Sequence, residues 1–204
     1  MKVIDWREFL EDGLNLGGKL SSMTVGVFDG VHRGHQALLK KILSQTDYTP
    51  VVVTFRENHK TMSNGQFSIN SGQSDIYSFQ RRLEIFGKMG IQITIVVDFT
   101  EEFRRMRGIE FLEILLKRGS VGFFAAGSNF RCGCGLDANA AVIREFFTSR
   151  GVPMEIIPEV LEGSLPVSSS RIREAAAAGD TALAAAMLGA PSGEAGYDPE
   201  QGPV

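Results

Sequence analysis

The sequence is short of cysteine, has no long apolar run and shows no export signal, and each shortage excludes a class of protein. The two cysteines, Cys132 and Cys134, are two positions apart, a separation that suits a disulfide poorly. No apolar segment approaches the length that crosses a bilayer, and the N-terminal stretch MKVIDWREFLEDG carries acidic residues through its apolar part. We therefore expect a cytoplasmic protein that does not associate with membranes.

A large excess of charge is also missing. The formal net charge is only −3 over 204 residues, and no stripe of basic and aromatic residues is present, so we expect no nucleic-acid partner. An anionic ligand would have to be bound by a local site. With 43% hydrophobic and 22% charged residues, the composition is that of a globular protein with a sizeable core.

Apolar segments alternate with amphipathic ones along the chain. Buried strands are expected at residues 23–28, 50–55, 91–99, 120–127 and 154–158. Helices are expected at residues 34–44, 79–90, 108–119 and 139–151, with Gly90 and Gly151 ending two of them. This order predicts an α/β fold with a doubly wound parallel sheet, which binds ligands outside the carboxyl ends of its strands.

The pattern covers residues 1–190, which we expect to form one domain. Residues 56–77 interrupt this alternating pattern with a polar, aperiodic segment that is longer than an ordinary loop between a strand and a helix. This segment is expected either to fold over a site as a flap or to be a disordered insertion. Residues 191–204 have the composition of a loop and are expected to be disordered.

A turn rich in glycine and histidine, residues 24–35 (TVGVFDGVHRGH), lies between an expected strand and an expected helix. The free N–H groups of the first helical turn point into such a loop, and the helix dipole favours phosphate there. Gly30 and Gly34 would let the backbone approach a ligand closely. His32 and His35 are three positions apart, so both can face the same spot and donate to phosphate oxygens. The turn therefore predicts a phosphate site.

The segment VSSSRIR, residues 167–173, predicts a second phosphate site at the start of a helix. Ser169, Ser170 and Arg173 share a helix face by their spacing, and Arg171 lies off that face. Two hydroxyls and a guanidinium can together hold several phosphate oxygens. An ordinary serine cap with a solvated arginine is the alternative interpretation.

At these residues a resemblance becomes clear. Residues 26–35, GVFDGVHRGH, resemble the G-x-F-D-G-x-H-x-G-H signature of bacterial FAD synthetases, a branch of the nucleotidylyltransferases. The matching residues are Gly26, Phe28, Asp29, Gly30, His32, Gly34 and His35. The segment VSSSRIR resembles the S-S-T-x-I-R motif of the same family, with Ser170 in place of threonine. The loop from Gly127 resembles G-x-[ND]-F-x-F-G, matched by Gly127, Asn129, Phe130 and Gly133.

The chain departs from the family at several positions. Val27 replaces the usual asparagine, and Cys132 replaces an aromatic residue. After the second expected strand the family usually has F-x-P-H-P, whereas residues 55–60 read FRENHK, with Asn58 at the histidine position and His59 one place later. The cysteine pair lies near two histidines, but C-x-C lacks the ligand spacing usual for zinc, so no zinc site is expected.

The resemblance implies a Rossmann-like nucleotidylyltransferase fold and transfer of AMP from ATP to FMN, with Mg²⁺ accompanying ATP. It implies catalytic roles for His32, His35, Ser169, Ser170 and Arg173. It implies nucleotide-binding roles for Gly26, Phe28, Asp29, Gly30, Gly34, Gly127, Asn129, Phe130 and Arg171. Asn129 would contact the nucleotide or its metal, and no other protein ligand for a metal is predicted. The resemblance stops near LGAP, so we expect a separate riboflavin kinase to supply FMN.

Two other functions are compatible with the sequence. One is the same transfer to a different phosphorylated acceptor, which the altered segment at residues 55–60 would permit. The other is a nucleotide- or flavin-binding relative without catalytic activity, for which Val27 and the lost P-H-P leave room. Formation of FAD would distinguish these functions from an FMN adenylyltransferase.

Overall fold

The centre of the molecule is a parallel sheet, in the computed structural model that describes residues 1–56, 62–63, 66–67 and 75–189. Its six strands run in the order β1-β6-β3-β2-β7-β10, and every neighbouring pair is parallel. The strands are β1 (Lys2–Asp5), β2 (Ser21–Val25), β3 (Thr49–Phe55), β6 (Ile93–Val97), β7 (Val121–Gly127) and β10 (Met154–Ile157). The sheet confirms the predicted α/β fold class.

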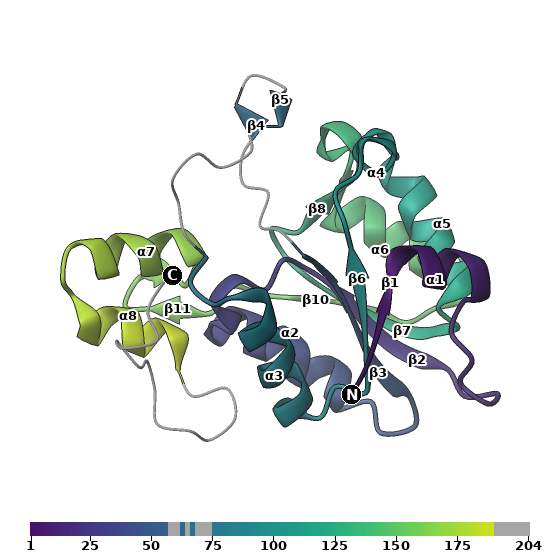
Figure 1. Cartoon of the computed structure of the whole chain (residues 1–204), viewed down its shortest axis with the longest axis horizontal. Coiled ribbons are helices and arrows are strands. Elements are labelled where there is room, and N and C mark those ends of the chain that lie inside the picture. Colours follow the sequence, from purple (N-terminus) through teal and green to yellow (C-terminus); the bar gives the residue numbers. More distant parts are fainter. Residues whose placement is uncertain (57–61, 64–65, 68–74, 190–204) are drawn as a thin grey trace.

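Helices cover both faces of the sheet (Figure 1). One face carries α2 (Arg33–Leu43) and α3 (Phe79–Met89), and the other carries α1 (Trp6–Asp12), α5 (Gly108–Arg118) and α6 (Ala140–Thr148). Successive strand residues point to opposite faces. In β3, Val51 and Val53 therefore pack with the side of α5 and α6, while Val52 packs with α2 and α3.

A third group of elements lies beyond the edge where the strands end. It consists of the hairpin of β11 (Leu161–Glu162) and β12 (Leu165–Pro166), followed by α7 (Ser169–Ala177) and α8 (Thr181–Leu188). Val167, Ile172 and Met187 form its small core, together with Ile76. The remaining elements are short: η1 (Asp29–Val31), β4 (Met62–Ser63), β5 (Gln66–Phe67), α4 (Glu101–Arg105), β8 (Arg131–Cys132), η2 (Cys134–Leu136) and β9 (Ala138–Asn139).

Most boundaries agree with the expected ones, but β2 and α6 end earlier than expected. The strand expected at residues 23–28 is β2, which ends at Val25 because the chain leaves the sheet there and Phe28 turns left-handed, with φ 57°. Helix α3 ends at Gly90 as predicted, with φ 100°. Helix α6, however, is capped by Ser149, two residues before the glycine expected to end it. The structure also adds β1, α1 and α8, which the apolar pattern did not indicate.

The expected flap at residues 56–77 falls mostly outside the described residues, and the expected disordered tail at 191–204 falls wholly outside them. Both therefore stay predictions, as does the assignment of residues 1–190 to one domain. Within the described part of the chain, no helix combines the length and the hydropathy needed to cross a bilayer.

Candidate functional site

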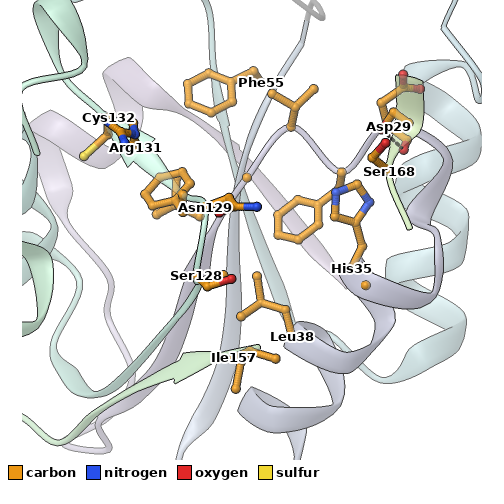
Figure 2. A pocket seen from close by; sticks show the side chains of 18 of the residues that line it. Asp29, His35, Leu38, Phe55, Ser128, Asn129, Arg131, Cys132, Ile157 and Ser168 are labelled. Atoms are coloured by element: carbon orange, nitrogen blue, oxygen red, sulfur yellow. Dashed lines mark hydrogen bonds between the residues drawn. The ribbon is translucent and has the colours of Figure 1, made fainter. Parts of the chain in front are cut away.

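A cavity of about 640 Å³ opens at the edge where the strands end (Figure 2). Its walls are the loop after β2, the first turn of α2, the loop after β7, the segment after β10 and the N-terminus of α7. Polar groups around Asp29, Ser168 and His35 lie on one side in Figure 2, and Phe55, Arg131 and Cys132 lie away from them. The sequence prediction of a site at this edge is therefore matched by a cavity in the right place.

The two histidines of the turn lie together at the polar end of the cavity. His32 is the N-cap of α2, and its Nδ1 accepts a hydrogen bond from the backbone N–H of His35 at 3.3 Å. The two rings stack, with centroids 3.6 Å apart and planes 16° apart. Because Nδ1 of His32 is an acceptor, its remaining proton is on Nε2, which is a donor. Among the described residues, Nδ1 of His35 is buried without a hydrogen-bond partner.

Both histidines are neutral at pH 7. Burial lowers the pKa of His32 to about 4, against a smaller opposing effect of Asp29. Burial also lowers the pKa of His35 well below 6.5, and the neighbouring His32 and the charge of Arg82 act in the same direction. Each ring can therefore offer one N–H to a ligand, and the helix dipole adds a partial positive charge at the same place.

Two glycines of the motif make room for its own side chains. The ring of Phe28 lies against Gly26, where a Cβ would be 3.0 Å from the ring. A Cβ on Gly34 would be 3.2 Å from the ring of His32. Both glycines also line the cavity. Phe28 is fully buried and packs edge-on against His35, with ring centroids 5.3 Å apart, so it helps to hold the histidine ring in place.

Gly30 has a different role from the one expected. Its φ is +76°, and a Cβ there would be 3.0 Å from Ile76 and 3.2 Å from Leu188. Gly30 is buried against these side chains and is not among the described residues that line the cavity. The glycine therefore serves a left-handed turn and close packing, and the structure gives no support for its expected close approach to a ligand.

Asp29 joins the two motifs that the sequence analysis singled out. It is only 2% exposed, and its Oδ1 accepts from the backbone N–H of Ile76 at 2.8 Å. Its Oδ2 forms an ion pair with Nη1 of Arg173, and its backbone carbonyl accepts from Oγ of Ser169 at 3.0 Å. Nε and Nη2 of Arg173 are buried without a partner among the described residues. Ser169 and Arg173 are thus brought beside the histidine turn, and both contact Asp29 from the same side of α7, which agrees with the shared face that their spacing predicted.

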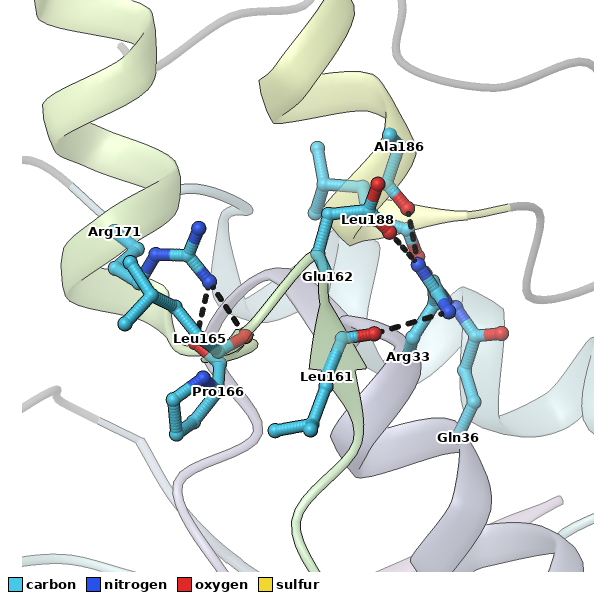
Figure 3. Close-up of polar contacts among 9 residues, drawn as sticks. All are labelled: Arg33, Gln36, Leu161, Glu162, Leu165, Pro166, Arg171, Ala186 and Leu188. Atoms are coloured by element: carbon cyan, nitrogen blue, oxygen red, sulfur yellow. Dashed lines mark hydrogen bonds and ion pairs between the residues drawn. The ribbon is translucent and has the colours of Figure 1, made fainter.

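The other residues of VSSSRIR are placed differently. Ser170 is exposed at the rim of the cavity rather than beside Ser169 and Arg173. Ser168, which the sequence analysis did not choose, caps α7 by accepting from the backbone N–H of Arg171 at 3.3 Å. Nη1 of Arg171 donates to the carbonyls of Leu165 and Pro166 at 2.9 and 2.7 Å (Figure 3). Arg171 therefore holds the hairpin and is not among the described residues that line the cavity, so its expected role in nucleotide binding stays a prediction.

Arg33, between the two histidines, attaches the same hairpin to α2 (Figure 3). It forms an ion pair with Glu162, and it donates to the carbonyls of Leu161 and Ala186 at 3.4 and 3.3 Å. Gln36, one turn further along α2, donates to the carbonyl of Leu188 at 2.7 Å. These contacts fix the hairpin and α8 relative to the histidines, a role that sequence patterns did not reveal.

The loop after β7 supplies the opposite wall. Asn129 is exposed and its Nδ2 donates to the carboxylate of Glu159, which follows β10. The asparagine is thus tied to a neighbouring strand end rather than to its own backbone. Glu159 was not predicted, although a polar residue directly after the apolar segment MEIIP was a usable signal. Phe130 and Gly127 also line the cavity, as expected from the motif.

No cluster of three or more histidine, cysteine, aspartate or glutamate side chains suited to a metal is present among the described residues. Cys132 is half-buried in the wall of the cavity, and burial, aided by the charge of Asp137, raises the pKa of its thiol to about 12. Its neutral thiol is a weak ligand and a weak nucleophile at pH 7. Cys134 is exposed.

The far end of the cavity is apolar. Six side chains line it: Phe55, Phe99, Phe103, Met106, Phe111 and Phe130. The ring centroids of Phe55 and Phe99 are 4.8 Å apart, and those of Phe99 and Phe103 are 5.4 Å apart. These rings come from the ends of β3 and β6 and from α4, so the same sheet edge that presents the histidines also presents an aromatic surface. The cavity can therefore hold a ligand with both a phosphate and a flat apolar ring system.

The parallel sheet and the histidine turn at its carboxyl edge define a Rossmann-like nucleotidyltransferase fold. The sequence profile of the family described as FAD synthetase matches residues 18–171, and the chain belongs to this family.

Several bacterial proteins are similar in sequence to this chain. The "Bifunctional riboflavin kinase/FMN adenylyltransferase" of Escherichia coli K12 is 28% identical over 172 residues, covering 83% of this chain and 54% of that protein. The protein of the same name from Pseudomonas fluorescens is 29% identical over 172 residues, covering 82% and 54%. The chain thus spans about half the length of these relatives. A Geobacillus thermodenitrificans protein, described by the same two activities, is 28% identical and is covered to 94%.

A solved structure supports the fold. The crystal structure titled as a macrolide-efflux protein of Streptococcus pneumoniae matches 93% of this chain and 60% of that chain, with a TM-score of 0.76. The sequences are 23% identical, so the match concerns the fold alone.

Proposed function

We propose that this protein is an FMN adenylyltransferase, which transfers AMP from ATP to FMN and releases FAD and pyrophosphate. One observation carries the proposal. The neutral histidine pair, Asp29 and Ser169 meet at one end of a cavity whose other end is aromatic, and Arg173 is paired with Asp29 at the histidine end. Such a cavity suits a reaction between a polyphosphate and a phosphorylated ring system.

The chemistry requires no general base from the protein. The second pKa of a phosphate monoester is ~6, so FMN arrives largely ionised and its phosphate oxygen can attack the α-phosphorus directly. The barrier is electrostatic, because an anion approaches a polyanion, and catalysis then depends on positioning and charge stabilisation. A direct displacement forms one P–O bond to FMN and breaks the one to pyrophosphate, with no covalent intermediate.

The residues divide this work. Nε2–H of His32 and the first turn of α2 would bind triphosphate oxygens, and His35 would contact the charge that develops in the transition state. The free Nε and Nη2 groups of Arg173 would hold the departing pyrophosphate together with Ser169, with Ser170 approaching from the rim. Mg²⁺ would enter with ATP and neutralise phosphate charge, and Asn129 and Glu159 are the oxygen-bearing side chains on the facing wall.

The acceptor would occupy the aromatic end. The isoalloxazine ring of FMN is flat and largely apolar, and Phe55, Phe99 and Phe103 offer faces and edges for it to pack against. A nucleotide-only acceptor would leave this end unused. The names of the similar bacterial proteins include a riboflavin kinase activity as well. We therefore propose that a riboflavin kinase supplies FMN to this protein in the cytoplasm.

The test is to incubate the purified protein with ATP and Mg²⁺, and with FMN or riboflavin, and to separate the products by chromatography. FAD and pyrophosphate from FMN, and no adenylylated product from riboflavin, are expected. His35→Ala, checked for folding by circular dichroism, should lose most of this turnover. If ATP binds but no FAD forms, FMN is not the acceptor. That result would favour another phosphorylated acceptor, or a nucleotide-binding protein without catalytic activity. Near-normal turnover by the folded variant would remove His35 from the mechanism.

A further inference from the structure

Arg82 is the largest fully buried side chain of the described residues, and it lies outside the cavity. An arginine is rarely buried unless its donors are bound. Arg82 belongs to α3, whose other buried residues, Ile85 and Phe86, pack against the sheet. Its burial therefore needs an explanation other than hydrophobic packing.

The guanidinium binds the ends of two strands. Nη1 donates to the carbonyl of Val27 at 2.6 Å and to that of Phe55 at 3.1 Å, and Nη2 donates to the carbonyl of Arg56 at 3.1 Å. Oγ1 of Thr54 lies 3.3 Å from Nη1 and also donates to the Val27 carbonyl, at 3.2 Å. Val27 lies just past β2, and the other two carbonyls are at the end of β3, where the strands diverge and the ladder stops.

Those carbonyls belong to both ends of the cavity. Val27 immediately precedes Phe28, whose left-handed backbone starts the loop that carries the histidines. Phe55 is part of the aromatic end. One rigid, planar group of donors therefore sets the spacing between the loop that presents the histidines and the strand end that presents the aromatic surface.

We propose that Arg82 is a positioning residue, which keeps the phosphate end and the aromatic end of the cavity in register for the transfer. The inference rests on the proposed function, since register matters only if a donor and an acceptor occupy the two ends. Transfer between two bound reactants is sensitive to misplacement, and a shift of about 1 Å can reduce the rate about 100-fold.

The charge of Arg82 provides a readout that does not depend on turnover. The charged groups that act on His35 are Arg82 from α3 and His32 at the start of its own helix. Arg82 in turn lies near the carboxylates of Asp75, which precedes α3, and Asp29 on η1, and Asp29 pairs with Arg173. Arg82 contributes to the low pKa of His35, after burial and His32. Removing the guanidinium should therefore raise the pKa of His35, whereas a lysine at position 82 should preserve it.

The experiment compares Arg82→Met and Arg82→Lys with Arg81→Met, the neighbouring arginine that pairs with Glu84 at the helix surface. Each variant is assayed for FAD formation well below its unfolding temperature, and the His35 pKa is followed by NMR titration. For Arg82→Met we expect kcat to fall about 10- to 100-fold. In the same variant, the KM values for ATP and FMN should change less than about threefold, and the pKa of His35 should be raised. Arg82→Lys should retain part of the turnover and the wild-type pKa, and Arg81→Met should match the wild type.

The outcomes separate the two proposals. No FAD from the wild type overturns the proposed function, and FAD from the wild type with unchanged kcat in a folded Arg82 variant overturns only the positioning role. A rise in KM at unchanged kcat also overturns it, since that result indicates lost ground-state binding. If Arg82→Met does not fold, Arg82→Lys carries the test, and its wild-type kcat would refute the inference.

Discussion

Asp29 and Arg173 form a buried ion pair although 144 residues separate them in the sequence. Their side chains are only 2% and 15% exposed. The pair attaches α7 to the loop after β2, and through Ile76 it also reaches the segment that leads into α3. The carboxylate of Asp29, in the first motif, thus holds Arg173 of the second motif in place.

Asp29→Asn should be strongly destabilising. Asparagine keeps an oxygen for the N–H of Ile76, but its amide cannot neutralise the guanidinium of Arg173, which is left buried and unpaired. We expect the free energy of unfolding to fall by about 3 kcal/mol, measured by urea denaturation. Glu113→Gln, in an exposed pair with Lys117, is the control and should cost less than about 0.5 kcal/mol. Equal losses in the two variants would contradict the role of the buried pair.

Gly30→Ala tests the revised role of this glycine. The change places a Cβ at positive φ and against Ile76 and Leu188, so two costs add. Gly135 also has a positive φ, +70°, but a Cβ there meets no atom within 4 Å. Gly135→Ala should therefore cost only the backbone part, about 1 kcal/mol, whereas Gly30→Ala should cost about 3 kcal/mol. Similar values in urea denaturation would show that packing around Gly30 is loose.

The stability of the protein should fall on mild acidification because of the histidine pair. His32 has a pKa of about 4 in the folded protein, and an unfolded histidine has one near 6.5. The contribution is therefore fully present above pH 6.5 and is lost as the pH falls towards 4, because only the unfolded chain binds the proton in this window. The loss should reach about 3 kcal/mol for His32, and His35 acts in the same direction.

The measurement is urea denaturation at several pH values between 7.5 and 4.5. His32→Asn retains a capping side chain but does not titrate, so its unfolding free energy should depend less steeply on pH than that of the wild type. The difference between the two curves removes the contribution of the carboxylates common to both. Parallel curves would contradict the low pKa of His32.

The two cysteines should differ in reactivity. Cys134 is exposed, whereas the pKa of about 12 leaves almost no thiolate on Cys132 at pH 8. We expect iodoacetamide to alkylate Cys134 first and Cys132 on the order of 100-fold more slowly, followed by mass spectrometry of the peptides. Cys134→Ser should then show no rapid labelling, and rapid labelling of that variant would place Cys132 in a more open environment.

The sequence pattern predicted most of the central strands because these are apolar on both faces, as β3 is along its run of valines. Residues of β2 are also buried throughout, but Ser21, Ser22 and Thr24 are polar, so this strand was predicted only from Met23 onward. The edge strand β1 escaped prediction for the opposite reason: it has four residues, and only Ile4 is buried. Helix α8 was missed because its alanine-rich sequence TALAAAML gives no amphipathic pattern.

The site was predictable where a motif places residues by local spacing. His32 and His35 are three positions apart on one helix start, and their stacking follows from that spacing. The role of Arg82 could not be read in this way, because FQRRLEIF has two adjacent arginines and only the topology decides which one is buried beneath the strand ends. The contacts of Arg171 could not be predicted, because the carbonyls that it binds belong to a neighbouring hairpin that no local pattern encodes.

The strand order also determines how the protein is assembled during its synthesis. Strands β1, β6, β3 and β2 lie within the first 97 residues, so these four of the six strands can pair as soon as β6 leaves the ribosome. The outer edge of β2 then stays open until β7, at residues 121–127, has been translated. The nascent chain therefore exposes the unpaired edge of β2 during this interval, which is the stage at which it is most open to pairing with another chain.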